Sequence, residues 1–390
     1  ACAIDAAASV KGLYLAGYTG TVTQNSGITV TVGADNYYQS TGTFTGSTGA
    51  TANDAITLAA NTGSFTLASG TFTPTAGTLT VGNAWTYTGG TFTAGIGTVQ
   101  FSTGDDGAAH LINSGAMSFN NVTFNGANIP KYSITGIMNI AGNLTLAGNT
   151  YLRLEGGTLA VSGNVILNNA GIGGTATAAA TILFTGSNTQ TLSATSGTGY
   201  ITPISINKSG GTLTIQDTIV VKAVSSINIW TYTAGTVSAG TSTVRFATGG
   251  DATYTINSGA MSFNNVTFGG SNIPRYSITG TMDINGNLAI AGVYTLNNGT
   301  ITVAGDITVT DTSFSGTTAI TLDGTGAQVI TLTANDWTDG ALTINKASGT
   351  ATSSGTWTIP GAVTITSGAL TLGAATSFSS SVTVGASGTL

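Results

Sequence analysis

Residues 115–148 read GAMSFNNVTFNGANIPKYSITGIMNIAGNLTLAG, and residues 259–292 read GAMSFNNVTFGGSNIPRYSITGTMDINGNLAIAG. The two stretches are identical at 26 of 34 positions, without a gap and at a constant offset of 144 residues. A repeat of this length indicates a chain built as an array of similar units. The copies share strand patterning such as SFNNVTF and YSIT, and no group of catalytic side chains. The sequence therefore predicts a repeating β architecture and indicates function only by class.

Short runs in which apolar residues alternate with Thr, Ser or Asn recur along the whole chain, separated by glycine-containing turns. Ile28–Val32 and Thr78–Val81 are examples. Alternation gives each strand one apolar and one polar face, and no stretch shows sustained helical periodicity. The duplicated core positions that we expect are Phe119, Val122 and Phe124, with their copies Phe263, Val266 and Phe268.

Four strand-like runs open modules of unequal length, which fits a solenoid with variable loops. These runs are Thr98–Phe101, Thr181–Phe184, Thr243–Phe246 and Ala319–Leu322. We predict an all-β, right-handed parallel β-helix, with tandem β-sandwiches as the alternative. The repeats divide the chain into N-terminal rungs with an assembly segment (1–97), a first long repeat (98–242) and a second long repeat with an uncapped end (243–390).

Composition excludes several partners. Charged residues are 6% of the 390 residues, the net charge is −6, and the eight Lys and Arg are scattered singly. Nucleic acid is therefore not an expected partner, and no apolar run is long enough for a membrane helix. The start ACAIDAAAS suggests a processed N-terminus. Together with the paucity of Lys and Glu, it predicts a secreted or cell-surface protein.

Residues that could carry chemistry are few. Cys2 is the only cysteine and His110 the only histidine, so an intrachain disulfide and a two-histidine site are excluded, and a zinc site is not expected. Cys2 is either an unpaired thiol or an intermolecular link. The acidic pairs Asp105-Asp106 and Asp336 with Asp339 are interpreted as turn and loop residues. We expect no enzyme and no cofactor, with calcium bound by carbonyls and single Asp residues left open.

Two surface features would indicate a ligand. Trp85, Trp230 and Trp337 would have to be exposed and aligned to bind glycans. Thr-x-Thr pairs can match ice if every coil presents one pair in register. The pairs are Thr21/Thr23, Thr29/Thr31, Thr43/Thr45, Thr71/Thr73, Thr78/Thr80, Thr91/Thr93 and Thr300/Thr302. Because they are unevenly spaced, we expect no such ranks.

The openings such as GTVQF at 97–101 and the closings such as LTINKASGT at 342–350 resemble secreted β-helix repeat proteins of prokaryotic cell surfaces. These include haemagglutinin-like and autotransporter-passenger-like adhesins. The resemblance covers most of the chain as a pattern and transfers no functional residues. It implies an elongated extracellular scaffold or adhesin.

The preferred functional hypothesis is a structural subunit of an extracellular filament or surface layer, which assembles head to tail as a homopolymer. Both ends of the sequence show the alternating pattern of strands, and an open edge of a solenoid can pair with another copy. The alternatives are a cell-surface adhesin or carbohydrate-binding fibre and, less favoured, a polysaccharide-degrading β-helix enzyme, which would need paired carboxylates.

Overall fold

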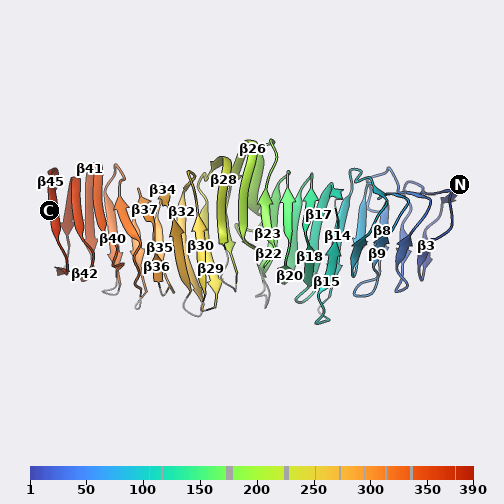
Figure 1. Cartoon of the computed structure of the whole chain (residues 1–390), viewed down its shortest axis with the longest axis horizontal. Coiled ribbons are helices and arrows are strands. Elements are labelled where there is room, and N and C mark those ends of the chain that lie inside the picture. The colour runs from blue at the N-terminus through green and yellow to red at the C-terminus, as the bar shows by residue number, and fades with distance from the viewer. Residues whose placement is uncertain are drawn as a thin grey trace. The chain divides into compact units, whose positions relative to one another are not determined.

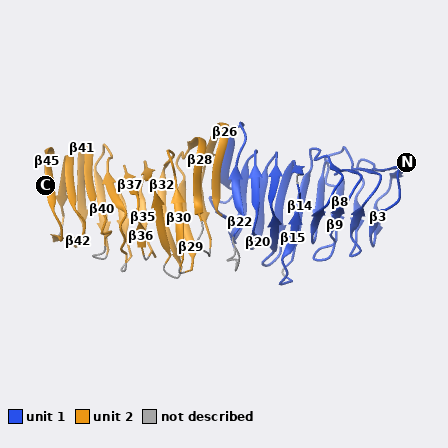
Figure 2. Cartoon of the chain, viewed as in Figure 1, with its two compact units in different colours: residues 1–202 blue, residues 203–390 orange. Residues whose placement is uncertain are grey.

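A computed structural model describes the chain except residues 105, 116, 173–178, 224–227, 251, 272–273, 294, 312–313, 334–336 and 374, and the side chains of 149 and 150. The described residues form strands and no helix. They divide into two compact units, Ala1–Thr202 and Pro203–Leu390 (Figure 2). The division at 97/98 and 242/243, which rests on sequence repeats, stays a prediction.

Successive coils of unit 1 stack by parallel strand pairing. The first coil contributes β1 (Cys2–Ile4), β2 (Ala8–Val10) and β3 (Leu13–Leu15), which pair in parallel with β4, β5 and β6 of the next coil. The blue end of Figure 1 shows strands such as β8 and β9 in this arrangement. Sandwiches pair their strands antiparallel, so the predicted parallel β-solenoid is confirmed and tandem sandwiches are excluded.

The strands of unit 1 form three faces, which we call A, B and C. Face A consists of β1, β4 (Thr21–Gln24), β7 (Thr43–Thr45), β10 (Thr71–Thr73) and β13 (Thr91–Phe92). Face B consists of β2, β5 (Val30–Val32), β8 (Ala55–Leu58), β11 (Thr78–Val81), β14 (Thr98–Thr103), β17 (Asn121–Gly126), β20 (Leu144–Glu155), β22 (Val165–Ile172) and β24 (Gln190–Ala194). Face C consists of β3, β6 (Tyr37–Gln39), β9 (Phe65–Leu67), β12 (Trp85–Tyr87), β15 (His110–Asn113) and β18 (Lys131–Thr135). The remaining strands are β16 (Ser118–Phe119), β19 (Ile137–Ile140), β21 (Thr158–Val161), β23 (Thr181–Phe184) and β25 (Thr198–Ile201).

Unit 2 repeats the same construction. One ladder runs through β26 (Ile204–Ile215), β28 (Asn228–Ser238), β30 (Thr253–Asn257), β33 (Arg275–Thr279) and β36 (Thr295–Asn297). A second runs through β27 (Thr218–Val221), β29 (Thr243–Gly249), β32 (Asn265–Ser271), β35 (Leu288–Ile290), β38 (Ile307–Val309) and β40 (Gln328–Leu332). A third runs through β31 (Ser262–Phe263), β34 (Thr281–Ile284), β37 (Thr300–Val303), β39 (Ala319–Leu322), β41 (Leu342–Ser354), β43 (Val363–Leu372) and β45 (Val382–Thr389). The strands β42 (Trp357–Ile359) and β44 (Thr376–Phe378) also pair.

The core of each unit is a set of inward ladders. On face B, Val99, Val122 and Leu144 occupy one register position in successive coils and are at most 3% exposed. Burying a side chain of this size contributes about 1.5–3 kcal/mol. The six predicted core residues are confirmed, since all have exposed fractions of 0–1%.

Candidate functional site

The three tryptophans that could have faced a ligand are buried, so the exposure that glycan binding by them would require is not met. Trp85 is 0% exposed, and its ring stacks on that of Phe65 with 4.0 Å between centroids. Trp230 is 0% exposed, with its indole Nε1 3.3 Å from the sulfur of Met261. Trp337 is 2% exposed. Trp85 holds the same inward register position as Phe65, so its indole fills the core.

The acidic pairs are only partly described. Asp105 and Asp336 lie outside the described residues. Asp106 accepts a hydrogen bond from the amide of Ala108 at 2.9 Å, as a turn residue would. The interpretation of both pairs as turn and loop residues stays a prediction.

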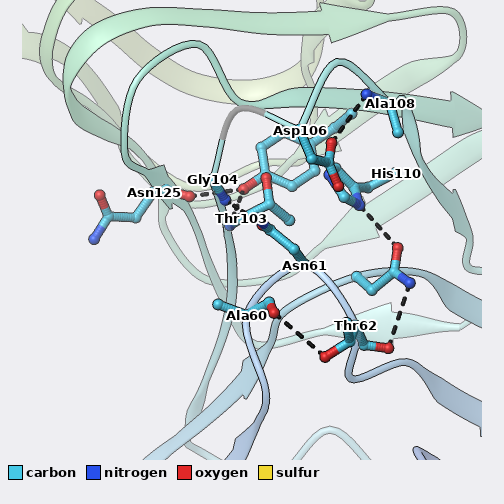
Figure 3. A network of polar contacts seen from close by, with 11 residues as sticks. Ala60, Asn61, Thr62, Thr103, Gly104, Asp106, Ala108, His110 and Asn125 are labelled. Carbon is cyan, nitrogen blue, oxygen red and sulfur yellow. Dashed lines mark hydrogen bonds and ion pairs between the residues drawn. The ribbon is translucent and has the colours of Figure 1, made fainter. Parts of the chain in front are cut away.

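His110 is buried in a polar network that ties one coil to its neighbours (Figure 3). Its Nδ1 lies 2.8 Å from Oδ1 of Asn83, and its Nε2 lies 3.3 Å from Oδ1 of Asp106. In the same network the amide of Gly104 donates to Oδ1 of Asn61 at 2.5 Å. At the duplicated position, 144 residues on, stands Tyr254. The network holds the turn before β15 in place, which is a structural role.

Asp54 is a buried carboxylate that sequence reasoning missed. It is 0% exposed and accepts hydrogen bonds from the amides of Gly27 (2.6 Å) and Thr51 (3.0 Å) and from the Thr51 hydroxyl (2.6 Å). The Ser47 hydroxyl is a further donor. These hydrogen bonds, that from Ser47 first, hold the pKa of Asp54 well below its usual range. Asp54 joins the turn after β7 to the preceding coil.

Lys346 is a buried cation within the LTINKASGT stretch at 342–350, and the sequence analysis did not single it out. It is 1% exposed, and its Nζ donates to the carbonyl oxygen of Gly324 at 2.6 Å and to Oε1 of Gln328. Burial lowers the pKa of Lys346, and the neighbouring Asp323 opposes that shift. Gln328 in turn donates to the carbonyls of Val303 (2.9 Å) and Gly305 (2.6 Å). This polar corner links three coils of unit 2.

Face A presents threonine ranks, contrary to our expectation. Thr21, Thr43 and Thr71 pair directly across β4, β7 and β10, and Thr71 pairs with Thr91 of β13. A second rank runs through Thr23, Thr45 and Thr73, and the amide of Thr93 donates to the carbonyl of Phe72 at 2.9 Å. The expectation failed because pairs such as Thr29/Thr31 and Thr78/Thr80 belong to face B. When the pairs of both faces are counted together, their spacing is uneven, although face A presents one Thr-x-Thr pair in each of four successive coils.

The missed signal is a four-residue motif. GTVT at 20–23 and GTFT at 42–45, 70–73 and 90–93 all begin with a glycine. Gly42, Gly70 and Gly90 have positive φ values of 64°, 83° and 89°. A Cβ on Gly70 would lie 2.5 Å from the carbonyl oxygen of Gly42, and one on Gly90 would lie 2.7 Å from that of Gly70. Glycine therefore sets the same corner in the coils that begin at Gly42, Gly70 and Gly90, and loops of unequal length do not disturb the register.

The terminal strands expose apolar side chains that interior coils bury. Val382 and Val384 of β45 align with Val363 and Ile365 of β43. The β43 pair is 0% exposed, whereas Val382 and Val384 are 36% and 46% exposed. At the other end Val10 aligns with the buried Val32 and is 40% exposed. In the described chain, β45 pairs only with β43 and β2 only with β5. Within residues 1–390, the first and last coils therefore present inward-ladder residues and strand edges without a neighbour.

Polar side chains line two adjoining cavities on unit 1. The larger, of about 640 Å³, is bordered by Asn125, Asn128, Gly148 and Asn168. The smaller, of about 360 Å³, shares Gly148 and Asn168 and adds Tyr200. The register between β20 and β22 shifts between Gly148 and Tyr151, and this irregularity lies beside both cavities. Together they offer amide groups and one aromatic ring to a polar ligand.

Other predicted features are placed as follows. Cys2 is exposed on β1, and its role as an intermolecular link stays a prediction. Among the described residues no three His, Cys, Asp or Glu side chains are grouped to hold a metal ion, and the expectation about calcium stays open. No helix in the described part of the chain is long and apolar enough to cross a membrane.

No protein-family model matches this sequence, and comparisons with curated proteins and with solved structures found no match.

Proposed function

We propose that the protein is a structural subunit of an extracellular filament or surface layer, which assembles head to tail through its terminal coils. The observation that carries the proposal is the exposure of Val382 and Val384 at positions that the preceding coil buries. A further coil stacked on β45 would cover both side chains and pair the free strand edge. The proposal assigns the protein no catalytic role.

We infer that a second copy would cover this edge, because the first coil of residues 1–390 also exposes an apolar side chain that the following coil buries. Val10 continues an inward ladder and is 40% exposed, and β2 has a free edge. Contact between two different ends of identical subunits is heterologous and does not close, so it gives an open filament. Unprotected strand edges are ready templates for such pairing. The small number of charges, 6% of residues, leaves little repulsion to prevent it.

Charged substitutions at the terminal coils test the assembly. Val384→Lys would place an ammonium group in the proposed contact and should abolish sedimentation of polymers, as should Val10→Lys. Val329→Lys is the matched control, because Val329 is 41% exposed on β40, which is paired on both sides. If all three variants fold and polymerise as the parent does, the head-to-tail contact is wrong.

A glycan-binding fibre is the second candidate function, and the Asn-lined cavities of unit 1 favour it. Asn168 is exposed and borders both cavities. Asn168→Leu should abolish glycan-array binding, whereas Asn25→Leu, at an exposed position away from the cavities, should leave it intact. Absence of any glycan binding by the parent protein would dismiss this candidate.

A further inference from the structure

Face A of unit 1 carries a regular array of threonine side chains, and we propose that this face binds ice. The array has two ranks of four, Thr21/Thr23, Thr43/Thr45, Thr71/Thr73 and Thr91/Thr93. No register shift interrupts the pairing of β4, β7, β10 and β13. The occupant is a lattice of water molecules, and the function is additional to the structural role.

The spacing of the array follows from strand geometry. Neighbouring parallel strands lie about 4.8 Å apart, and two residues along a strand span about 6.6 Å. The hydroxyl and methyl groups therefore repeat on a nearly rectangular net. The prism face of hexagonal ice presents oxygen atoms with closely similar repeats in two perpendicular directions. Four coils in register give enough positions for that match to be cumulative.

The array rests on a ladder of stacked aromatic rings. Beneath the threonines, the rings of Phe44 and Phe72 stack at 5.2 Å with planes 15° apart. The rings of Phe72 and Phe92 lie 6.1 Å apart with planes 14° apart. These small angles show that the three rings keep a similar orientation in successive coils. Threonine is also stiff at χ1 because its Cβ is branched, so its groups are ordered before water arrives.

The array is chemically suited to water. Within the described residues, none of the eight hydroxyls makes a hydrogen bond to another protein group. Some other threonines of unit 1 use their hydroxyls within the protein, since that of Thr29 donates to the carbonyl of Asn53 at 3.0 Å and that of Thr75 to the carbonyl of Asp54 at 2.8 Å. All eight array positions are uncharged. Ice is neutral and excludes ions, so an uncharged protein face can lie against the crystal without burying a charge.

Face B supplies the internal comparison. Thr57 and Thr80 are outward neighbours in register on β8 and β11, in the same coils as Thr45 and Thr73. On that face, however, Ala55 and Gln100 interrupt the threonine ranks. Thr45 and Thr73 on face A and Thr57 and Thr80 on face B are all half-buried and lie in the same two coils, so the two pairs differ in the continuity of the net around them. We expect ice to bind face A and not face B.

The experiment is ice partition of the purified 390-residue protein. A single ice crystal is grown slowly from the solution, and the protein in ice and liquid is measured by tyrosine and tryptophan absorbance. The parent protein should enter the ice and show thermal hysteresis. The double variant Thr45→Lys, Thr73→Lys should lose both effects, down to the level of an inert protein. The control Thr57→Lys, Thr80→Lys carries the same added charge and should retain them.

Circular dichroism and the unfolding temperature establish that both double variants are folded. Thr45→Glu with Thr73→Glu repeats the test with the opposite charge if the Lys pair does not fold. Exclusion of the parent protein from ice would overturn the proposal, and so would equal ice binding by the face A and face B variants. Filament formation is read separately at temperatures above freezing, so failure of either proposal leaves the other identifiable.

Discussion

The hydroxyl of Tyr132 accepts a hydrogen bond from the backbone amide of Thr103 at 3.2 Å. It also lies 2.9 Å from the carbonyl oxygen of Phe101 and 2.7 Å from that of Asn125. In the duplicated copy, the Tyr276 hydroxyl accepts a hydrogen bond from the amide of Thr248 at 3.3 Å. Each tyrosine thus joins backbone groups of the preceding coil to its own coil, since the Tyr276 hydroxyl also lies 2.6 Å from the carbonyl oxygen of Gly269 on β32.

These buried tyrosines predict loss of stability at alkaline pH. Burial raises the pKa of Tyr132 and of Tyr276 to about 12. Because the unfolded value is near 10, this stabilisation is complete below pH 10 and is lost as the pH rises towards 12, at about 2–3 kcal/mol per tyrosine. Urea unfolding at pH 8 to 12 measures it. The Tyr276→Phe variant should be less stable than the parent at pH 8, and its unfolding free energy should fall less steeply above pH 10. An unchanged dependence on pH would contradict the role given to Tyr276.

Lys346 predicts the opposite dependence. Its pKa in the folded protein lies below the usual value of 10.5, so the unfolded chain binds more protons between those two values and the stability rises with pH across that window. Lys346→Met removes the titration but leaves Oε1 of Gln328 without this donor, which costs about 1–3 kcal/mol. The stability of the parent relative to this variant should increase from pH 7 to pH 10. A constant difference in unfolding free energy would refute the prediction.

Asp54 predicts sensitivity to acid. Its pKa lies well below the unfolded value of 3.8, so its stabilisation is present above that pH and is lost as the pH falls further. Asp54→Asn turns an amide group towards donors that need an acceptor, and it should lower the unfolding temperature at pH 7. The difference from the parent should shrink below pH 3. Equal unfolding temperatures at pH 7 would show that the carboxylate is dispensable.

Truncation of the Phe72 side chain should cause a large loss of folding stability. It is 0% exposed and stacks on Phe44, with Phe65 edge-on at 4.8 Å. Phe72→Ala should destabilise the protein by about 3–5 kcal/mol, because the cavity cannot refill from rigid neighbouring coils. Chemical denaturation measures the change. Thr80→Ala, at an outward position one strand later, is the control and should change stability by less than about 0.5 kcal/mol.

The sequence predicted the strands and the core because alternation within a few residues is a local signal, and it predicted the stacking because the long duplication indicates repeated units. Phe119 and Phe263 illustrate this, since each is buried where the pattern placed it. Whether Trp85 is exposed or buried could not be predicted in the same way, because a tryptophan side chain occurs both in exposed glycan-binding surfaces and in hydrophobic cores. The threonine ranks on face A were not predicted either. The register between Thr45 and Thr73 depends on the length of the chain that connects them, and the spacing of Thr-x-Thr pairs along the chain combines pairs from two faces.

The measurement that tests the structural role most directly is negative-stain electron microscopy of the purified 390-residue protein, beside Val384→Lys and Val329→Lys. The account predicts unbranched filaments for the parent and for Val329→Lys, and separate particles for Val384→Lys. Separate particles of the parent protein at all concentrations, or filaments of undiminished length from folded Val384→Lys, would contradict it.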